Sequence, residues 1–252
     1  MSQNTRKKVV IVTGASTGIG YDIAKLFIEK GSHVVMNANN PDRLKRAYLS
    51  LGAPKNVTYV AGDISLASTG KKLARMAFEK YGRIDVLINN AGAFAPKPFL
   101  EVTEDDLELY WKVNLKGTYF ATQAVMPHMV QQNEGSIINI GTVLVDHAIA
   151  GFPATAPLTS KGGVHALTKQ LAAEFGQNNI KINTIAPGII RSPLQGKIGV
   201  DNADALAGLH LLNRIGETSD IASMAYHLAQ SNFITGEIIN VDGGHVAGHV
   251  FG

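Results

Sequence analysis

The stretch VTGASTGIG (12–20) places glycines at a spacing that suits the binding of a dinucleotide. Gly14 permits a tight turn, Gly18 lets the backbone approach a phosphate, and Gly20 lets a helix pack closely on a strand. A helix that begins here offers free N–H groups and the positive end of its dipole to a pyrophosphate. Because the stretch joins an apolar strand to a helical segment, it predicts a nucleotide-binding turn rather than a plain glycine-rich connection.

The end of the next expected strand, NANNPDR (37–43), indicates which coenzyme fits. NAD sites place Asp or Glu here to accept hydrogen bonds from ribose hydroxyls. This chain has neutral Ala38 and Asn39 at that place, and Asp42 is expected on the outer face of the following helix. The residues that could receive a 2′-phosphate are Arg43, Ser16, Asn39 and Asn40. The pattern favours NADP(H) over NAD(H), although an exposed helix is also an ordinary place for an arginine.

The loop VLVDHAIAGF (143–152) contains a candidate proton donor. It leaves the carboxyl end of an expected strand, where ligands of open α/β sheets bind. His147 lies in this loop beside Asp146, and histidine titrates near neutral pH and serves widely as a general acid. The alternative is a histidine with a surface or structural role.

Apolar runs of strand length alternate with segments of helical period along the chain. The expected strands are 8–13, 33–38, 57–63, 84–92, 135–142, 180–188 and 237–244. The expected helices are 20–31, 41–51, 66–82, 103–129, 157–176 and 219–230. Apolar strands between helices predict an α/β fold, a Rossmann-type doubly wound parallel sheet of about seven strands with helices on both faces.

We expect one domain over residues 1–252, because α/β folds of this length are often undivided. The irregular segment 189–213 is long for a connection in a compact domain, so we expect a lid or substrate loop. Its middle, NADALAGLHLL (202–212), has helical period and an apolar face, which would also suit a helix that packs on its own domain.

Composition excludes several classes of function. Hydrophobic residues make up 45% and charged residues 17%, which argues against disorder, and the net charge of +3 forms no basic stripe for nucleic acid. There is no cysteine, which excludes disulfides and thiolate chemistry. We expect no metal site, and we interpret His245 and His249 as a flexible or subunit-contact tail. Without a signal-like start or a membrane-length apolar run, the expected location is the cytoplasm.

Several further motifs follow the glycine turn. They are GDIS (62–65), NNAG (89–92), KVNLKG (112–117), APG (186–188), IIRSP (189–193), RIGETSDIA (214–222) and FITGEIINVDGG (233–244). Together with TGASTGIG they resemble the short-chain dehydrogenase/reductase family from residue 8 to about residue 244. The resemblance implies a bound nicotinamide coenzyme, a small-molecule carbonyl or alcohol substrate, and a homotetramer or homodimer.

The resemblance and the glycine turn together define an expected coenzyme site. Asp63 takes the place where the family holds the adenine ring, and Ser192 a place that often contacts the carboxamide. The expected coenzyme residues are Gly14, Ser16, Thr17, Gly18, Ile19, Gly20, Asn39, Arg43, Asp63, Ile64, Asn90, Ala91, Gly92, Lys161, Pro187, Gly188, Ile190 and Ser192.

The family's reaction uses asparagine, serine, tyrosine and lysine, and the resemblance implies that Asn114 and Lys161 are retained. Thr142 holds the serine position and keeps a hydroxyl for a substrate carbonyl. The tyrosine position, four residues before Lys161, holds Pro157, which has no proton to give. Proline suits the first turn of a helix, so we expect lost chemistry and an intact fold. Losing a positioned acid lowers rates roughly 100- to 10,000-fold.

The identity of the proton donor therefore stays open. His147 is one candidate; Tyr110, four residues before Asn114, and a water held by Lys161 and Thr142 are others. The expected function is an NAD(P)-dependent oxidoreductase with a non-standard proton donor. The alternatives are a nucleotide-binding pseudoenzyme, which Pro157 favours, and a non-redox enzyme in the same pocket, which the retained glycine turn disfavours.

Overall fold

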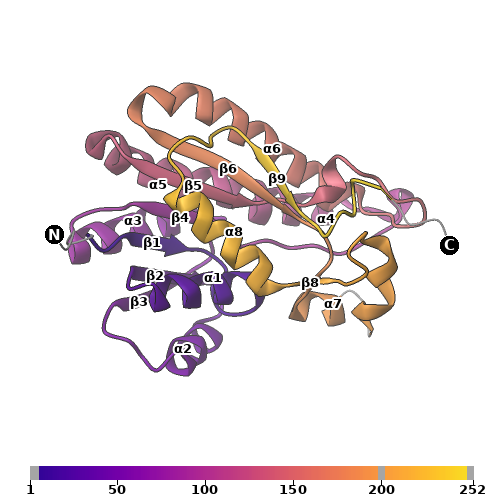
Figure 1. Ribbon diagram of the computed structural model, residues 1–252, viewed down its shortest axis with the longest axis horizontal. Coiled ribbons are helices and arrows are strands. Elements are labelled where there is room, and N and C mark those ends of the chain that lie inside the picture. Colours follow the sequence, from indigo (N-terminus) through magenta and orange to yellow (C-terminus); the bar gives the residue numbers. More distant parts are fainter. Residues whose placement is uncertain (1–5, 198–201, 249–252) are drawn as a thin grey trace.

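A parallel sheet forms the centre of the computed structural model, which describes residues 6–197 and 202–248 (Figure 1). The sheet has seven strands in the order β3-β2-β1-β4-β5-β6-β9. Their bounds are β1 Val9–Val12, β2 His33–Ala38, β3 Val57–Ala61, β4 Val86–Asn89, β5 Gly135–Ile140, β6 Ile180–Pro187 and β9 Ile238–Val241. All neighbouring strands pair in parallel, which confirms the predicted doubly wound α/β fold.

Helices cover both faces of the sheet (Figure 1). Their bounds are α1 Gly18–Glu29, α2 Pro41–Ser50, α3 Ala67–Tyr81, α4 Glu104–Tyr110, α5 Gly117–Gln132, α6 Thr155–Phe175, α7 Pro193–Lys197 and α8 Thr218–Gln230. One buried apolar cluster joins α1, α2 and α8 to the sheet, and a second joins α3, α5 and α6. The strands are therefore buried on both faces, which is why they are continuously apolar in sequence. Within the described ranges, no helix is both long and apolar enough to span a membrane.

The strand order reverses between β1 and β4, and this reversal determines where a ligand can bind. Parallel strands end at the same edge, so the turn after β1 and the loop after β4 lie beside each other. The loops after β5 and β6 follow at the same edge. A crevice outside the carboxyl ends at such a reversal is the usual ligand site of an open α/β sheet.

The long helix expected over 103–129 contains a turn that the sequence did not indicate. The chain runs through α4, a π-helical turn at Trp111–Lys116, and α5, which ends at Gln132. The amide of Gly117 donates to the carbonyl of Lys112, five residues earlier. The extra residue in this turn changes which side chains share a face, and π turns occur frequently at functional sites.

The segment 189–213, which was expected to be an irregular loop, contains short regular elements in the part that the structure describes. It contains β7 (Ile190–Arg191), which pairs in parallel with β8 (Gly216–Glu217), then α7 and a 3₁₀ helix at Ala203–Leu209. The helical pattern at 202–212 thus forms a tighter helix that ends earlier than expected. The Arg191 guanidinium donates to carboxylates on both sides, Asp204 and Glu217, and so ties the 3₁₀ helix to the β7–β8 pair.

Candidate active site at the carboxyl edge of the sheet

The glycine turn after β1 is clamped by the loop after β4. Gly14 has φ +65°, and a Cβ there would lie 2.7 Å from Asn90 Nδ2 and 2.8 Å from the Cα of Ala91. Asn90 Nδ2 donates to the carbonyls of Thr13 and Gly14 at 3.0 and 3.2 Å. The Thr13 hydroxyl accepts from the amides of Asn90 and Ala91. Asn90 and Ala91, both expected to contact coenzyme, therefore act at least in part by shaping the turn.

The start of α1 is suited to an anionic ligand. Thr17, which precedes the helix, makes no capping hydrogen bond with its side chain. The first N–H groups of α1 thus receive no acceptor from that side chain, and an anion can supply one. Gly18 has φ +59°, and a Cβ there would lie 3.5 Å from Cβ of Ser192. The structure therefore brings the segment after β6 against the glycine turn. Ser16 and Ile19 are partly buried in the same turn.

Asn39 and Arg43, the expected coenzyme residues that follow β2, are both exposed, and neither is a carboxylate. The side chain of Asn40 accepts from the backbone amide of Arg43. Asn40 is thus engaged in capping α2. Asp63 is exposed, and one of its oxygens accepts from the amide of Ser65 at 2.9 Å. Ile64, the residue after it, is buried.

Asn37 is a residue of this region that the sequence did not single out. It is buried in β2, and its Nδ2 donates to the carbonyls of Val60 and Gly62 at 3.0 and 3.1 Å. These bonds fix the end of β3, and with it the start of the segment that carries Asp63.

Asn114 is fully buried in the π turn and joins two elements of the site. Its Oδ1 accepts from the amide of Ala93 at 2.8 Å, and its Nδ2 donates to the carbonyl of Ala93 at 3.0 Å. The same Nδ2 donates to the hydroxyl of Ser160 on α6 at 2.9 Å. The amide group thus connects the loop after β4 to α6. Ser160, which neighbours Lys161, was expected only to pack or bond locally, so its bond to Asn114 was not predicted from the sequence.

Lys161 projects from α6 toward the ends of β4 and β5. Its Nζ donates to the carbonyl of Ile140 at 2.6 Å. A Cβ at Gly92 would lie 3.4 Å from this Nζ and 3.2 Å from Oδ1 of Asn114, so both side chains flank Gly92. One ammonium proton is engaged, which leaves two for a ligand. Burial lowers the pKa of Lys161 to about 8.

Pro157 is the third residue of α6 and is buried. Amides in the first turn of a helix need no partner within the helix, so the missing N–H has little effect on the fold. The expectation that proline would fit the first turn is confirmed. The carbonyl of Pro157 accepts from the hydroxyl of Ser160 at 2.7 Å, so this turn also holds the group that contacts Asn114.

Thr142 follows β5 and begins a short 3₁₀ turn at Val143–Val145. Its Oγ1 accepts from the amide of Leu144 at 3.3 Å, which leaves the hydroxyl proton for another acceptor. The residue before it, Gly141, must be glycine, because a Cβ there would lie 2.5 Å from Nε2 of His165. The ring of His165 is buried, and its Nδ1 lies 3.6 Å from a carboxylate oxygen of Asp146. Burial lowers the pKa of His165.

His147 belongs to a row of three histidine rings at the same edge. Its ring centroid lies 5.2 Å from that of His245, which lies 5.2 Å from that of His210, and both pairs meet edge to face. His210 Nε2 accepts from the amide of Ile189, just after β6. His245 is buried, so its expected place in a flexible or subunit-contact tail was wrong. His249 lies outside the described residues.

The remaining expected coenzyme residues lie at the end of β6. Pro187 is buried, and a Cβ at Gly188 would lie 2.9 Å from the Cα of Asp242. The amide of Gly188 donates to the carbonyl of Val241, which keeps the chain against β9. Ile190 is buried in β7.

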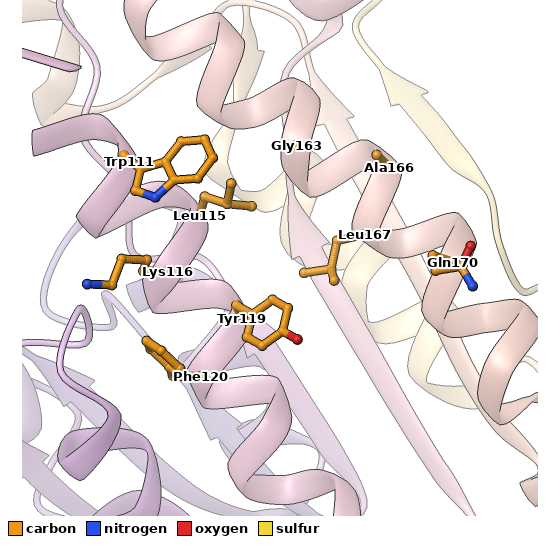
Figure 2. A pocket seen from close by; sticks show the side chains of 9 residues that line it. All are labelled: Trp111, Leu115, Lys116, Tyr119, Phe120, Gly163, Ala166, Leu167 and Gln170. Carbon is orange, nitrogen blue, oxygen red and sulfur yellow. The ribbon is translucent and has the colours of Figure 1, made fainter. Parts of the chain in front are cut away.

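A separate apolar groove of about 460 Å³ lies between the π turn, α5 and α6. Figure 2 shows Trp111, Tyr119 and Leu167 among the side chains that line it. The lining residues include neither Asn114 nor Lys161. A Cβ at Gly163 would lie 2.9 Å from a methyl group of Leu115, so the π turn and α6 approach each other closely at the groove.

Comparisons with known proteins agree with this architecture. A family profile described as short chain dehydrogenase matches residues 8–203. The chain is 34% identical over 245 residues to the 3-oxoacyl-acyl-carrier-protein reductase FabG of Thermotoga maritima, covering 95% of this chain and 98% of that protein. It is 35% identical over 246 residues to the L-rhamnose-1-dehydrogenase of Scheffersomyces stipitis, covering 94% and 95%. The solved structure of ElxO with NADP bound superposes with a TM-score of 0.88 at 32% identity, covering 96% of this chain and 100% of that chain.

Replacing Lys161 with methionine is expected to change how stability depends on pH. The native pKa is about 8 and the ordinary value is 10.5, so the unfolded chain binds more protons between these pH values. The stability of the natural chain therefore rises with pH across this window, and Lys161→Met removes that rise. From pH 7.5 to 10.5, the difference in unfolding free energy between the two proteins should grow by up to about 3 kcal/mol in urea titrations.

The matched control is Lys169→Met, an exposed position on the same helix, which should leave the pH dependence unchanged. An equal pH dependence in Lys161→Met and the natural chain would contradict a desolvated ammonium at this site.

Proposed function

The chain belongs to the short-chain dehydrogenase family, and on that premise we propose an NADP(H)-dependent oxidoreductase that interconverts a carbonyl compound and its alcohol. We further propose that its proton donor is not tyrosine. One arrangement supports the oxidoreductase function most directly: Lys161 Nζ and Asn114 Oδ1 flank Gly92, next to a glycine turn held by Asn90. Family members are oxidoreductases that use a nicotinamide coenzyme in general, which supplies or accepts a hydride when bound.

The residues of the glycine turn fit a dinucleotide. A Cβ at Gly14 would collide with Asn90 and Ala91, so glycine keeps the turn tight, and the start of α1, where the Thr17 side chain makes no cap, offers N–H groups to a pyrophosphate. Lys161 has two ammonium protons left for ribose hydroxyls. A nucleotide-binding pseudoenzyme would also keep the glycine turn, but the retained Lys161 and Asn114 would then need another reason.

The proposed chemistry moves one hydride to the carbonyl carbon and one proton to the carbonyl oxygen, or the reverse. The hydroxyl of Thr142 has a proton available to hydrogen-bond the carbonyl oxygen. Asn114 fixes the position of the loop after β4 relative to α6, because it bonds both Ala93 and Ser160. We assign the proton transfer to His147, because it lies at the carboxyl edge, five residues after Thr142, and imidazole is a common general acid and base in enzymes. Tyr110 is a weaker candidate, since its hydroxyl already donates to the carbonyl of Ala95 at 3.3 Å.

We favour NADP(H) over NAD(H) because the end of β2 carries no carboxylate to repel a 2′-phosphate. Arg43 is exposed at the start of α2 and can approach that phosphate. The solved structure with NADP bound supports the preference by similarity. The alternative of a non-redox enzyme in this fold is disfavoured by the retained glycine turn. The expected cytoplasmic location stays a prediction.

We also propose that the protein forms a homo-oligomer, with a second copy of this chain covering the groove between α5 and α6. Trp111 and Tyr119 line the groove and are 51% and 47% exposed, which is unusual for large aromatic side chains unless a partner covers them. Aromatic side chains are enriched in protein interfaces.

NADPH is expected to bind the purified protein about 10-fold or more tightly than NADH, because only NADPH can pair with Arg43. Arg43→Ala should weaken NADPH binding about 10-fold and leave NADH binding unchanged, as measured by fluorescence titration. Gly14→Ala should abolish both, because its Cβ would collide with Asn90 and Ala91. The control is Arg46→Ala, exposed on the same helix. Equal affinities would contradict the preference for NADP(H), and no binding of either would contradict the proposed function.

His147→Ala is expected to lower kcat for carbonyl reduction about 100-fold or more while leaving NADPH affinity unchanged, because only the proton donor is lost. Pro157→Tyr should raise kcat, since it restores a phenol one turn before Lys161. The rates follow from NADPH oxidation with a panel of ketones. His33→Ala, at the opposite edge of the sheet, is the control. Unchanged turnover in His147→Ala would remove His147 as the donor. No gain from Pro157→Tyr would show that the pocket limits the reaction.

Trp111→Asp is expected to shift the protein toward a monomer in sedimentation velocity, because a charge would be buried in the proposed interface. Phe233→Asp, at a fully exposed position elsewhere, should leave the distribution unchanged. A natural chain that sediments as a monomer would contradict the proposed interface.

A further inference from the structure

Two loops beside the site each contain a stretch made entirely of apolar residues. AFAP (93–96) follows β4 after Gly92, and AIAGFPA (148–154) leads into α6. Loops at the carboxyl edge of an α/β sheet usually carry the polar groups that recognise a ligand. Here the two stretches offer none from their side chains, so any selectivity that they confer depends on shape and apolar contact.

The two loops meet through a pair of aromatic rings. The rings of Phe94 and Phe152 are stacked, with centroids 6.1 Å apart and an angle of 14° between their planes. Both side chains are partly exposed, and neither belongs to the two buried clusters on the faces of the sheet. The pair is therefore available to a ligand and is not part of the packing that holds the sheet to its helices.

The aromatic pair stands close to the reacting groups. Phe94 directly follows Ala93, whose backbone is bonded twice to Asn114. Phe152 lies five residues before Pro157, at the entry to the helix that carries Lys161. Consecutive Cα atoms are about 3.8 Å apart, so the Cα of Phe94 is within about 8 Å of the Cα of Gly92, which Lys161 flanks.

Hydrogen bonds hold the two loops, and with them the aromatic pair, in place. The amide of Lys97 donates to the carbonyl of Pro153 at 2.7 Å, which links one loop to the other. The hydroxyl of Tyr110 donates to the carbonyl of Ala95. The ammonium of Lys97 bonds Asp106 at 2.6 Å, and this bond is the main reason that the pKa of Asp106 is lowered to about 2. The ammonium of Lys97, which directly follows AFAP, is thus already paired with a carboxylate, whereas Asp146 and His147 directly precede AIAGFPA.

We propose that Phe94 and Phe152 determine substrate choice, and that they select carbonyl compounds whose non-reacting group is a flat aromatic ring. This inference rests on the proposed oxidoreductase function. A flat ring gains from stacking or edge contact with the two phenylalanines. A polyhydroxylated or anionic substrate would lose hydration against AFAP and AIAGFPA, whose side chains offer no hydrogen bonds.

The test is ligand binding by isothermal titration to the protein saturated with NADP⁺, using acetophenone and dihydroxyacetone as probes. Acetophenone is expected to bind at least about 10-fold more tightly than dihydroxyacetone. Phe94→Ala and Phe152→Ala should each weaken acetophenone binding about 10-fold and leave dihydroxyacetone and NADP⁺ binding unchanged. Phe99→Ala is the matched control, since Phe99 follows the first loop and is 71% exposed.

Phe94→Leu keeps an apolar side chain if the alanine variant fails to fold. It should reduce the preference for acetophenone over cyclohexyl methyl ketone, because a flat face is lost while apolar contact remains. If acetophenone binds no better than dihydroxyacetone, or if the Phe94 and Phe152 variants bind it normally, the proposed selection is wrong. Those results with NADP⁺ still bound would leave the oxidoreductase function standing, whereas loss of coenzyme binding in the natural chain would refute that function itself.

Discussion

The candidate site depends on the paired hydrogen bonds between the amide of Asn114 and the backbone of Ala93. Asn114 is fully buried, so an unpaired amide there would be unfavourable by roughly 1–3 kcal/mol, and the pairing fixes its orientation. The same side chain bonds Ser160, and through it the first turn of α6. One amide thus sets the positions of the loop that carries Phe94 and of the helix that carries Lys161. The π turn is what directs that amide into the site.

Pro157 shows how far chemistry and fold can be separated at one position. The first turn of α6 accepts proline because its amide needs no helical partner, and the carbonyl of Pro157 still anchors Ser160. Lys161, one turn later, keeps its bond to Ile140 and its place beside Gly92. The geometry that binds a coenzyme therefore does not require a phenol. In the proposed function the proton comes from another element, which is why the histidines at this edge bear on the proposed mechanism.

Two parts of the proposed substrate site are held in place by different kinds of interaction. Phe94 and Phe152 are held by bonds within and between their loops, whereas the segment after β6 is tied down by exposed ion pairs of Arg191. Exposed ion pairs contribute little stability and weaken with salt. Firm attachment of the loops proposed to recognise the substrate, and weaker attachment of the segment after β6, agree with an enzyme whose ligands must enter and leave.

The sequence alone determined the alternation of strands and helices, the glycine turn, and the fit of Pro157 in a first helical turn, because these depend on residues within a few positions of one another. It did not reveal the π turn, since one inserted residue barely alters an apolar pattern. It also missed the contact between His147, His245 and His210, the stacking of Phe94 on Phe152, and the bond between Asn114 and Ser160. Those contacts join residues on separate elements, so they depend on how the elements pack, which only the tertiary structure decides.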